Sequence, residues 1–186
     1  MALNVVQVEA FQQLLLEVPR LVDQIERRSG GLAEQVLDWL KRVETALESN
    51  RIASVSRVAA LRAQLLQAGR GIQGADVQVT GRPTRRKIQD ATAAMALQRG
   101  NQLVHDVIAE RETVFGEAER LTRQLVAVAE AKGIVQACRS HAPTTALSCI
   151  QQAIAADTDL AGGYLRLVSL VGKYDVAVFL DRALPF

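Results

Sequence analysis

The sequence predicts an all-α protein: a helical bundle with one long helix and a smaller helical region at the carboxyl end. Residues 84–132 contain no proline, and their apolar side chains recur at alternating steps of three and four, which places them on one side of a helix. Hydrophobic residues make up 49% of the 186, whereas aromatic residues make up only 4%. That balance is typical of helices packed closely through small aliphatic side chains.

Residues 1–69 are expected to form the amino-terminal helices. Asn4 is placed to cap the first helix, whose apolar side chains form one face that Val6, Leu14 and Leu21 widen. Pro19 lacks a backbone N–H, so it predicts a kink or a helix boundary. Further helices are predicted over residues 32–48 and 52–69, joined by short connections that favour antiparallel neighbours.

The rest of the chain divides into three segments that we expect to belong to one structural domain. Residues 70–83 are glycine-rich and predict a linker or loop. Residues 84–132 form the long helix, which would span roughly 70 Å if unbroken, so it either breaks near Gly100 or projects and packs against a partner. Residues 133–186 form the carboxyl-terminal helical region, in which 174–180 could instead be a strand by propensity.

Charge and cysteine content indicate the class of protein. The net charge of +2 is too small to argue for nucleic acid by itself. No Lys or Arg precedes Arg20, and polar residues interrupt the first apolar run, which excludes a signal peptide or membrane span there. Two cysteines do not make a disulfide framework. These features favour a cytoplasmic bacterial protein with no membrane partner and no cofactor.

The apolar stripe of the long helix predicts an interface. The interface candidates are Val107, Arg111, Val114, Leu121, Leu125 and Val128. An uncovered stripe would expose an apolar band to water, and a charged residue in such a seam, here Arg111, usually lies at an edge or specifies a partner. The stripe therefore predicts a protein partner or a homo-oligomer.

A basic cluster marks the start of the long helix and is a candidate polyanion-binding site. The cluster consists of Arg82, Arg85, Arg86 and Lys87. The helix macrodipole disfavours positive charge at this end, so local stability does not explain these residues, whereas phosphate suits both arginine and free amides. The alternative is a solvated basic loop paired with acids elsewhere, and the absence of aromatic residues weakens any case for base stacking.

A second candidate site combines Arg99 and His105. The run Arg99-Gly100-Asn101-Gln102-Leu103-Val104-His105 resembles the arginine-to-histidine motif of HEPN ribonucleases, which are all-α. The resemblance implies that Arg99 and His105 would together handle the scissile phosphate of RNA. On an unbroken helix, residues six apart point about 240° apart, so the shared site needs a break near Gly100. The alternative places His105 on a helix surface or interface.

Possible metal ligands lie near the carboxyl end. Cys138, His141 and Cys149 could contribute to a zinc site, but no fourth ligand is evident, and buried cysteines usually act as small hydrophobic residues. Asp157 and Asp159 could bind a divalent cation, although capping of the next helix explains them more simply.

These observations favour a non-catalytic helical binding or adaptor subunit of a bacterial complex, associating through the long amphipathic helix. One alternative is a nucleic-acid-binding subunit that uses the basic cluster. The other is a HEPN-like ribonuclease that uses Arg99 and His105.

Overall fold

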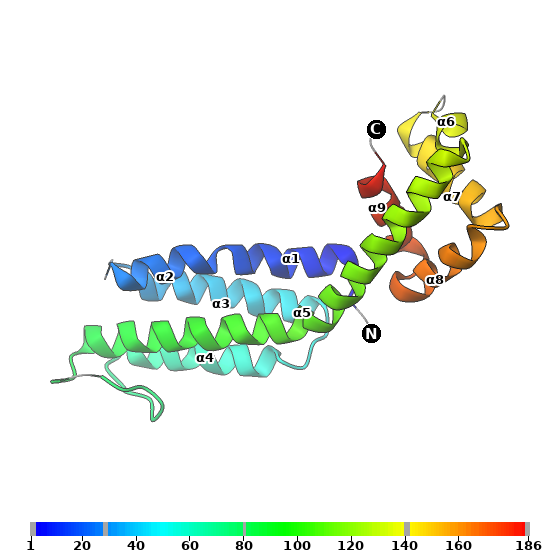
Figure 1. Ribbon diagram of the computed structural model, residues 1–186. Helices are drawn as coiled ribbons and strands as arrows, with labels where there is room; N and C mark the ends of the chain where they lie inside the picture. The colour runs from blue at the N-terminus through cyan, green and yellow to red at the C-terminus, as the bar shows by residue number, and fades with distance from the viewer. Residues whose placement is uncertain (1–2, 28–29, 80, 140–141, 185–186) are drawn as a thin grey trace. The chain divides into compact units, whose positions relative to one another are not determined.

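The computed structural model describes residues 3–27, 30–79, 81–139 and 142–184, with only the backbone at 143 and 144. Every regular element among these residues is a helix, which confirms the all-α prediction (Figure 1). The chain divides into two compact units. The first unit, which we call the bundle unit, is Val6–Ala109; the second, the carboxyl-terminal unit, is Met1–Val5 with Glu110–Phe186. The expectation of one structural domain stays a prediction.

The bundle unit is built from helices that lie side by side (Figure 1). They are α1 (Val5–Leu16), α2 (Val18–Glu26), α3 (Leu32–Ser49), α4 (Val55–Ala68) and the first part of α5 (Arg85–Ala131). Pro19 lies in the first turn of α2, so the boundary predicted there is confirmed. A proline is tolerated at that position because the first amides of a helix have no intrahelical acceptor.

Trp39 of α3 lies at the centre of the bundle unit with no exposed surface. Its indole Nε1 donates a hydrogen bond of 2.8 Å to the carbonyl oxygen of Leu14. The interruption after Leu16 leaves carbonyls of the last turn of α1 without a regular helical donor. The Leu14 carbonyl also accepts the backbone N–H of Glu17 at 3.4 Å, so the indole supplies a second, shorter hydrogen bond to it.

An ion pair also joins α3 to the residue between α1 and α2. Arg42 of α3 donates from both terminal nitrogens to the carboxylate of Glu17, the residue between α1 and α2. The hydrogen bond from Arg42 lowers the pKa of Glu17. Because Trp39 and Arg42 are three residues apart, one side of α3 supplies both contacts to the break.

Helix α5 is continuous through Gly100, so the break near Gly100 is not found, while packing of the helix against a partner stays a prediction. Gly100 is buried, and a Cβ atom added to it would lie 2.7 Å from Cζ3 of Trp39 and 3.1 Å from Cδ2 of Leu40. The glycine is therefore not a helix breaker here: it allows the indole of α3 to approach the backbone of α5.

The glycine-rich segment between α4 and α5 packs against the bundle unit and contains no strand among its described residues. Val77 is only 5% exposed. The side-chain amide of Gln73 donates to the Val77 carbonyl at 2.7 Å, and Asp76 pairs with Arg99 at 2.9 Å. The first hydrogen bond lies within the segment, and the ion pair attaches the middle of the segment to α5.

The carboxyl-terminal unit contains the rest of α5 and four shorter helices among its described residues. They are α6 (Ile134–Cys138), α7 (Pro143–Ala156), α8 (Ala161–Val171) and α9 (Lys173–Ala183). The strand alternative for residues 174–180 was wrong: the segment is helical, and Val176, Phe179 and Leu180 are buried. Their spacing is that of one helix face, so packing overrides the strand propensity.

A second close contact between helices involves Gly163 of α8. A Cβ atom at this position would lie 2.8 Å from Cδ2 of Leu125, which is only 5% exposed. The glycine thus makes room for a buried leucine of α5, while the adjacent Gly162 has open space around it.

The first described residues of the chain belong to the carboxyl-terminal unit, where polar groups hold them. Asp175, which is 8% exposed, accepts the backbone N–H of Val5 at 3.1 Å. The guanidinium of Arg111 donates from Nε to the carbonyl of Leu3 at 2.9 Å and lies over the ring of Phe115. A carboxylate that receives the first amide of α1 also suits the positive end of the helix dipole.

Replacing Gly100 with Ala should destabilise the bundle unit by about 1–3 kcal/mol, because the added methyl group overpacks a buried contact with Trp39. The matched control is Gly116→Ala in the same helix, where nothing lies within 4 Å of the added Cβ. The control substitution should raise the free energy of unfolding by about 0.5–1 kcal/mol, because alanine has a higher helix propensity than glycine. Urea unfolding followed by circular dichroism measures both changes, and equal stabilities of the two variants would contradict this packing.

Candidate functional site

The stripe of α5 that predicted an interface is mostly covered by the chain itself. Leu125 is buried in the core of the carboxyl-terminal unit, and Val114 and Leu121 are partly buried against it. Val107 and Arg111 are also partly buried, whereas Val128 is 43% exposed. The stripe therefore needs no second protein as cover, and its role as an interface stays a prediction.

The bonds of Arg111 explain why a charged residue interrupts this stripe. Its guanidinium carbon lies 4.8 Å from the centre of the Phe115 ring, and its Nε reaches the Leu3 carbonyl. An arginine over an aromatic face gains a cation–π attraction while it keeps its hydrogen bonds. The group that Arg111 recognises here is the amino-terminal segment of its own chain.

An exposed apolar surface lies on α1 instead. We call it the α1 outward face and define it by Val6, Ala10, Gln13 and Leu16, which are all exposed. Val6 is 66% and Leu16 is 70% exposed. Their spacing of four, three and three residues places them on one side of the helix, which also carries the partly buried Glu9.

Sequence reasoning missed this surface because α1 is apolar on more than one side. Val6 was expected to widen the buried face together with Leu14 and Leu21, but only the two leucines are buried. A helix with apolar side chains on every side is usually buried on every side. The signal in the sequence was the absence of charge along α1, where Glu9 is the only ionisable side chain.

The basic cluster lies at the amino end of α5 in the bundle unit. Arg82, Arg85, Arg86 and Lys87 are all exposed. Arg86 lies 3.8 Å from Asp90, whereas the side chains of Arg82, Arg85 and Lys87 make no ion pair with residues that the structure describes. The Thr84 hydroxyl accepts the N–H of Lys87 at 3.3 Å, which caps the helix start. The cluster presents positive charge to solvent.

Arg99 and His105 lie on the same unbroken helix, so their side chains point about 240° apart. Arg99 pairs with Asp76 of the glycine-rich segment at 2.9 Å, and His105 is exposed. The structure therefore does not bring the two residues together, and the helix break that the ribonuclease interpretation requires is not found.

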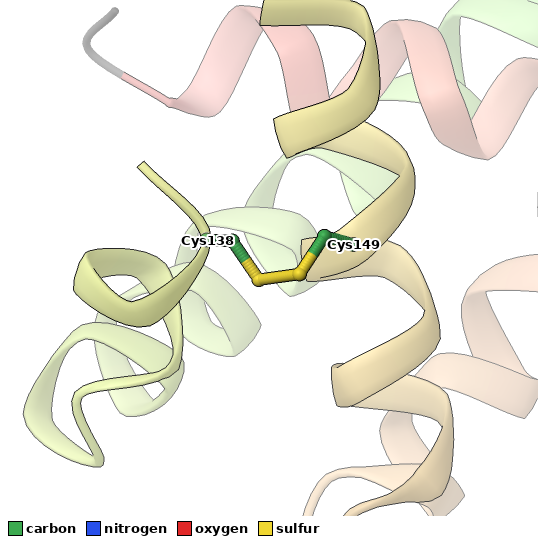
Figure 2. The surroundings of a disulfide bond; sticks show 2 residues. All are labelled: Cys138 and Cys149. Carbon is green, nitrogen blue, oxygen red and sulfur yellow. A yellow bond between two sulfur atoms is a disulfide. The ribbon is translucent and has the colours of Figure 1, made fainter. Parts of the chain in front are cut away.

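The two cysteines of the chain form a disulfide, contrary to the expectation that they act as separate buried residues (Figure 2). The bond links Cys138 at the end of α6 to Cys149 within α7, with their Cα atoms 5.9 Å apart. Because α6 and α7 pack against each other, a separation of 11 residues brings the two sulfurs together. The short spacing on either side of Pro143 was the only signal for this in the sequence.

The disulfide also bears on the possible metal site. A bonded sulfur is not a thiolate, so neither cysteine can act as a zinc ligand in this state. His141 lies outside the described residues. Within the part of the chain that the structure describes, no cluster of His, Cys, Asp or Glu is arranged to hold a metal ion.

Asp157 and Asp159 surround an ammonium group instead of a metal ion. Nζ of Lys132 lies 2.6 and 2.8 Å from the two carboxylate oxygens of Asp157 and 2.6 Å from Asp159. Asp157 also accepts the N–H groups of Asp159 and Leu160 in the turn before α8, whereas the N-cap residue of α8 is Leu160 and makes no side-chain capping hydrogen bond. The hydrogen bond from Lys132 lowers the pKa of Asp157 and raises that of Lys132.

Comparison with family models, with characterised proteins and with solved structures finds no match to this chain. Among the described helices, none is both long and apolar enough to cross a membrane.

Replacing Lys132 with Gln should raise the pKa of Asp157 towards its ordinary value of 3.8. In the native protein this carboxylate contributes stability above its unfolded pKa, and the contribution is lost as the pH falls through the lower folded pKa. The variant should therefore lose less stability on acidification. NMR titration of the Asp157 carboxyl carbon tests this, with Lys173→Gln as the control. An unchanged Asp157 pKa in Lys132→Gln would contradict the ion pair.

Proposed function

We propose that this protein is a non-catalytic helical binding subunit, and that its α1 outward face makes the contact with another protein chain. The supporting observation is that Val6 and Leu16, on one side of α1, are about two-thirds exposed. Contiguous exposed apolar surface on a folded protein is a feature of protein-binding sites. The proposal moves the contact from α5, whose stripe is largely buried, to α1.

The partner that this surface fits best is a second copy of the chain. A two-fold dimer places the same patch on both sides of the interface, so the exposed Val6 and Leu16 of each copy would cover apolar surface of the other. Ala10, between Val6 and the carboxyl end of α1, is small enough to let two helix backbones approach. The flanking charged residues Glu17 and Arg20 would lie at the polar rim.

The double substitution Val6→Glu and Leu16→Glu tests the surface. It should leave the thermal midpoint nearly unchanged, because exposed positions usually contribute within about 0.5 kcal/mol. It should convert a dimer into a monomer, as measured by light scattering during gel filtration at micromolar concentration. The matched control is Leu165→Glu, an equally exposed leucine of α8 at 67%, which should not change the mass.

A monomeric wild-type protein would have one of two consequences for the proposal. A wild-type monomer that captures a different protein, with capture lost in the double variant but not in Leu165→Glu, would keep the binding subunit and replace the second copy as its partner. A wild-type monomer with no partner that depends on Val6 and Leu16 would overturn the proposal.

A second candidate function is polyanion binding by the basic cluster. The observation in its favour is that Arg82, Arg85 and Lys87 carry exposed charge without an acid partner among the described residues. At a helix start this arrangement opposes the macrodipole, so it costs stability unless an anion binds there.

If the cluster binds a polyanion, affinity for single-stranded RNA should fall steeply with added salt, since phosphate contacts release counterions. Changing Arg82, Arg85 and Arg86 to Ala should reduce both the affinity and the salt slope without lowering the thermal midpoint. Fluorescence anisotropy over a salt series measures the effect, with Arg57→Ala and Arg123→Ala as controls outside the cluster. Binding that is unchanged by the triple substitution would eliminate this function.

A further inference from the structure

We propose that Cys138 and Cys149 form a reversible redox site that exchanges with small-molecule thiols and disulfides of the glutathione class. Three features of the carboxyl-terminal unit support this: the pairing of the two cysteines (Figure 2), their unequal exposure as residues, and the small size of the helix that the bond anchors.

The two cysteine residues differ in exposure. Cys138 is 3% exposed, whereas Cys149 is only partly buried. Thiol–disulfide exchange requires an incoming thiolate to reach one sulfur, and access decides which sulfur is attacked. The incoming thiolate therefore attacks Sγ of Cys149, and Cys138 is the leaving group.

Glutathione and glutathione disulfide are the only reactants that the thiol–disulfide exchange needs. One glutathione thiolate bonds to Sγ of Cys149, the bond to Cys138 breaks, and the Cys138 thiolate takes up a proton. A second glutathione thiolate then releases Cys149 and forms glutathione disulfide. In the opposite direction, glutathione disulfide forms a mixed disulfide with Cys149, and the Cys138 thiolate displaces glutathione to close the bond.

The bond restrains α6 more than the rest of the unit. Helix α6 has five residues and begins at Gly133, which has a φ of 75°. A helix this short is not stable by itself, so its position depends on packing of Val135 and on the link to α7. The larger helices have separate contacts in the core, among them Leu125, Leu167 and Phe179. Reduction should therefore loosen α6 while the unit stays folded.

The test uses the full chain, reduced and then incubated with glutathione disulfide before alkylation and mass spectrometry. Relative to the reduced protein, the treated wild type should be lighter by two hydrogen atoms, as disulfide formation requires, and should carry no glutathione. Cys138→Ser should retain one glutathione on Cys149, because no second thiol displaces it. Cys149→Ser should react at least tenfold more slowly, because its remaining thiol is buried. Two free thiols in the treated wild type, or equal rates in the two single variants, would overturn the proposal.

Amide hydrogen exchange supplies a second test that does not depend on detecting a glutathione adduct. Amides of α6 should exchange at least tenfold faster in the reduced wild type than in the oxidised protein, while amides of α8 and α9 change little. The double variant Cys138→Ser with Cys149→Ser should exchange like the reduced protein whether or not glutathione disulfide is added. Identical α6 exchange in the oxidised and reduced wild type would contradict the proposed restraint.

Discussion

The packing of the bundle unit depends on the position of one indole ring. Trp39 fills the space between three helices: its Nε1 binds the carbonyl of Leu14, and its ring lies against the backbone of α5 at Gly100. The first contact lies in the last turn of α1, shortly before Pro19, and the second requires a residue without a side chain in α5. The leucine, the tryptophan and the glycine are far apart in the sequence, yet they meet in the core of the bundle unit. A continuous α5 follows from this arrangement, because the glycine serves packing and does not interrupt the helix.

Continuity of α5 in turn limits what the protein can do. Arg99 and His105 remain on different sides of one helix, and Arg99 is engaged by Asp76. Later along α5, Leu125 is enclosed with Gly163 of α8, and Arg111 binds the amino-terminal segment. The residues that made α5 look like an interface thus hold the chain's own elements. The exposed apolar side chains of α1 are then the stronger basis for a proposed protein contact.

Sequence reasoning succeeded where the signal is local. The period of the apolar residues, the missing N–H of Pro19 and the glycines between helices predicted the helices and most of their limits. It failed where the answer depends on what meets a residue from elsewhere in the chain. Gly100 could have broken a helix or admitted a ring, and only the position of Trp39 decides between these. Val6 has the hydropathy of a core residue but lies on the outer side. The pairing of Cys138 with Cys149 depends on the packing of α6 against α7, and Asp175 meets Val5 across nearly the whole sequence.

Residue-resolved amide hydrogen exchange by NMR across residues 96–108 tests the central claim, that α5 is one helix held at Gly100 by Trp39. The account predicts that the amides on both sides of Gly100 are protected to the same degree, and that they exchange only when the bundle unit unfolds. Fast exchange confined to residues 99–105, with protected amides before and after them, would show a break at Gly100. That result would contradict the packing described here and would allow Arg99 and His105 to approach each other.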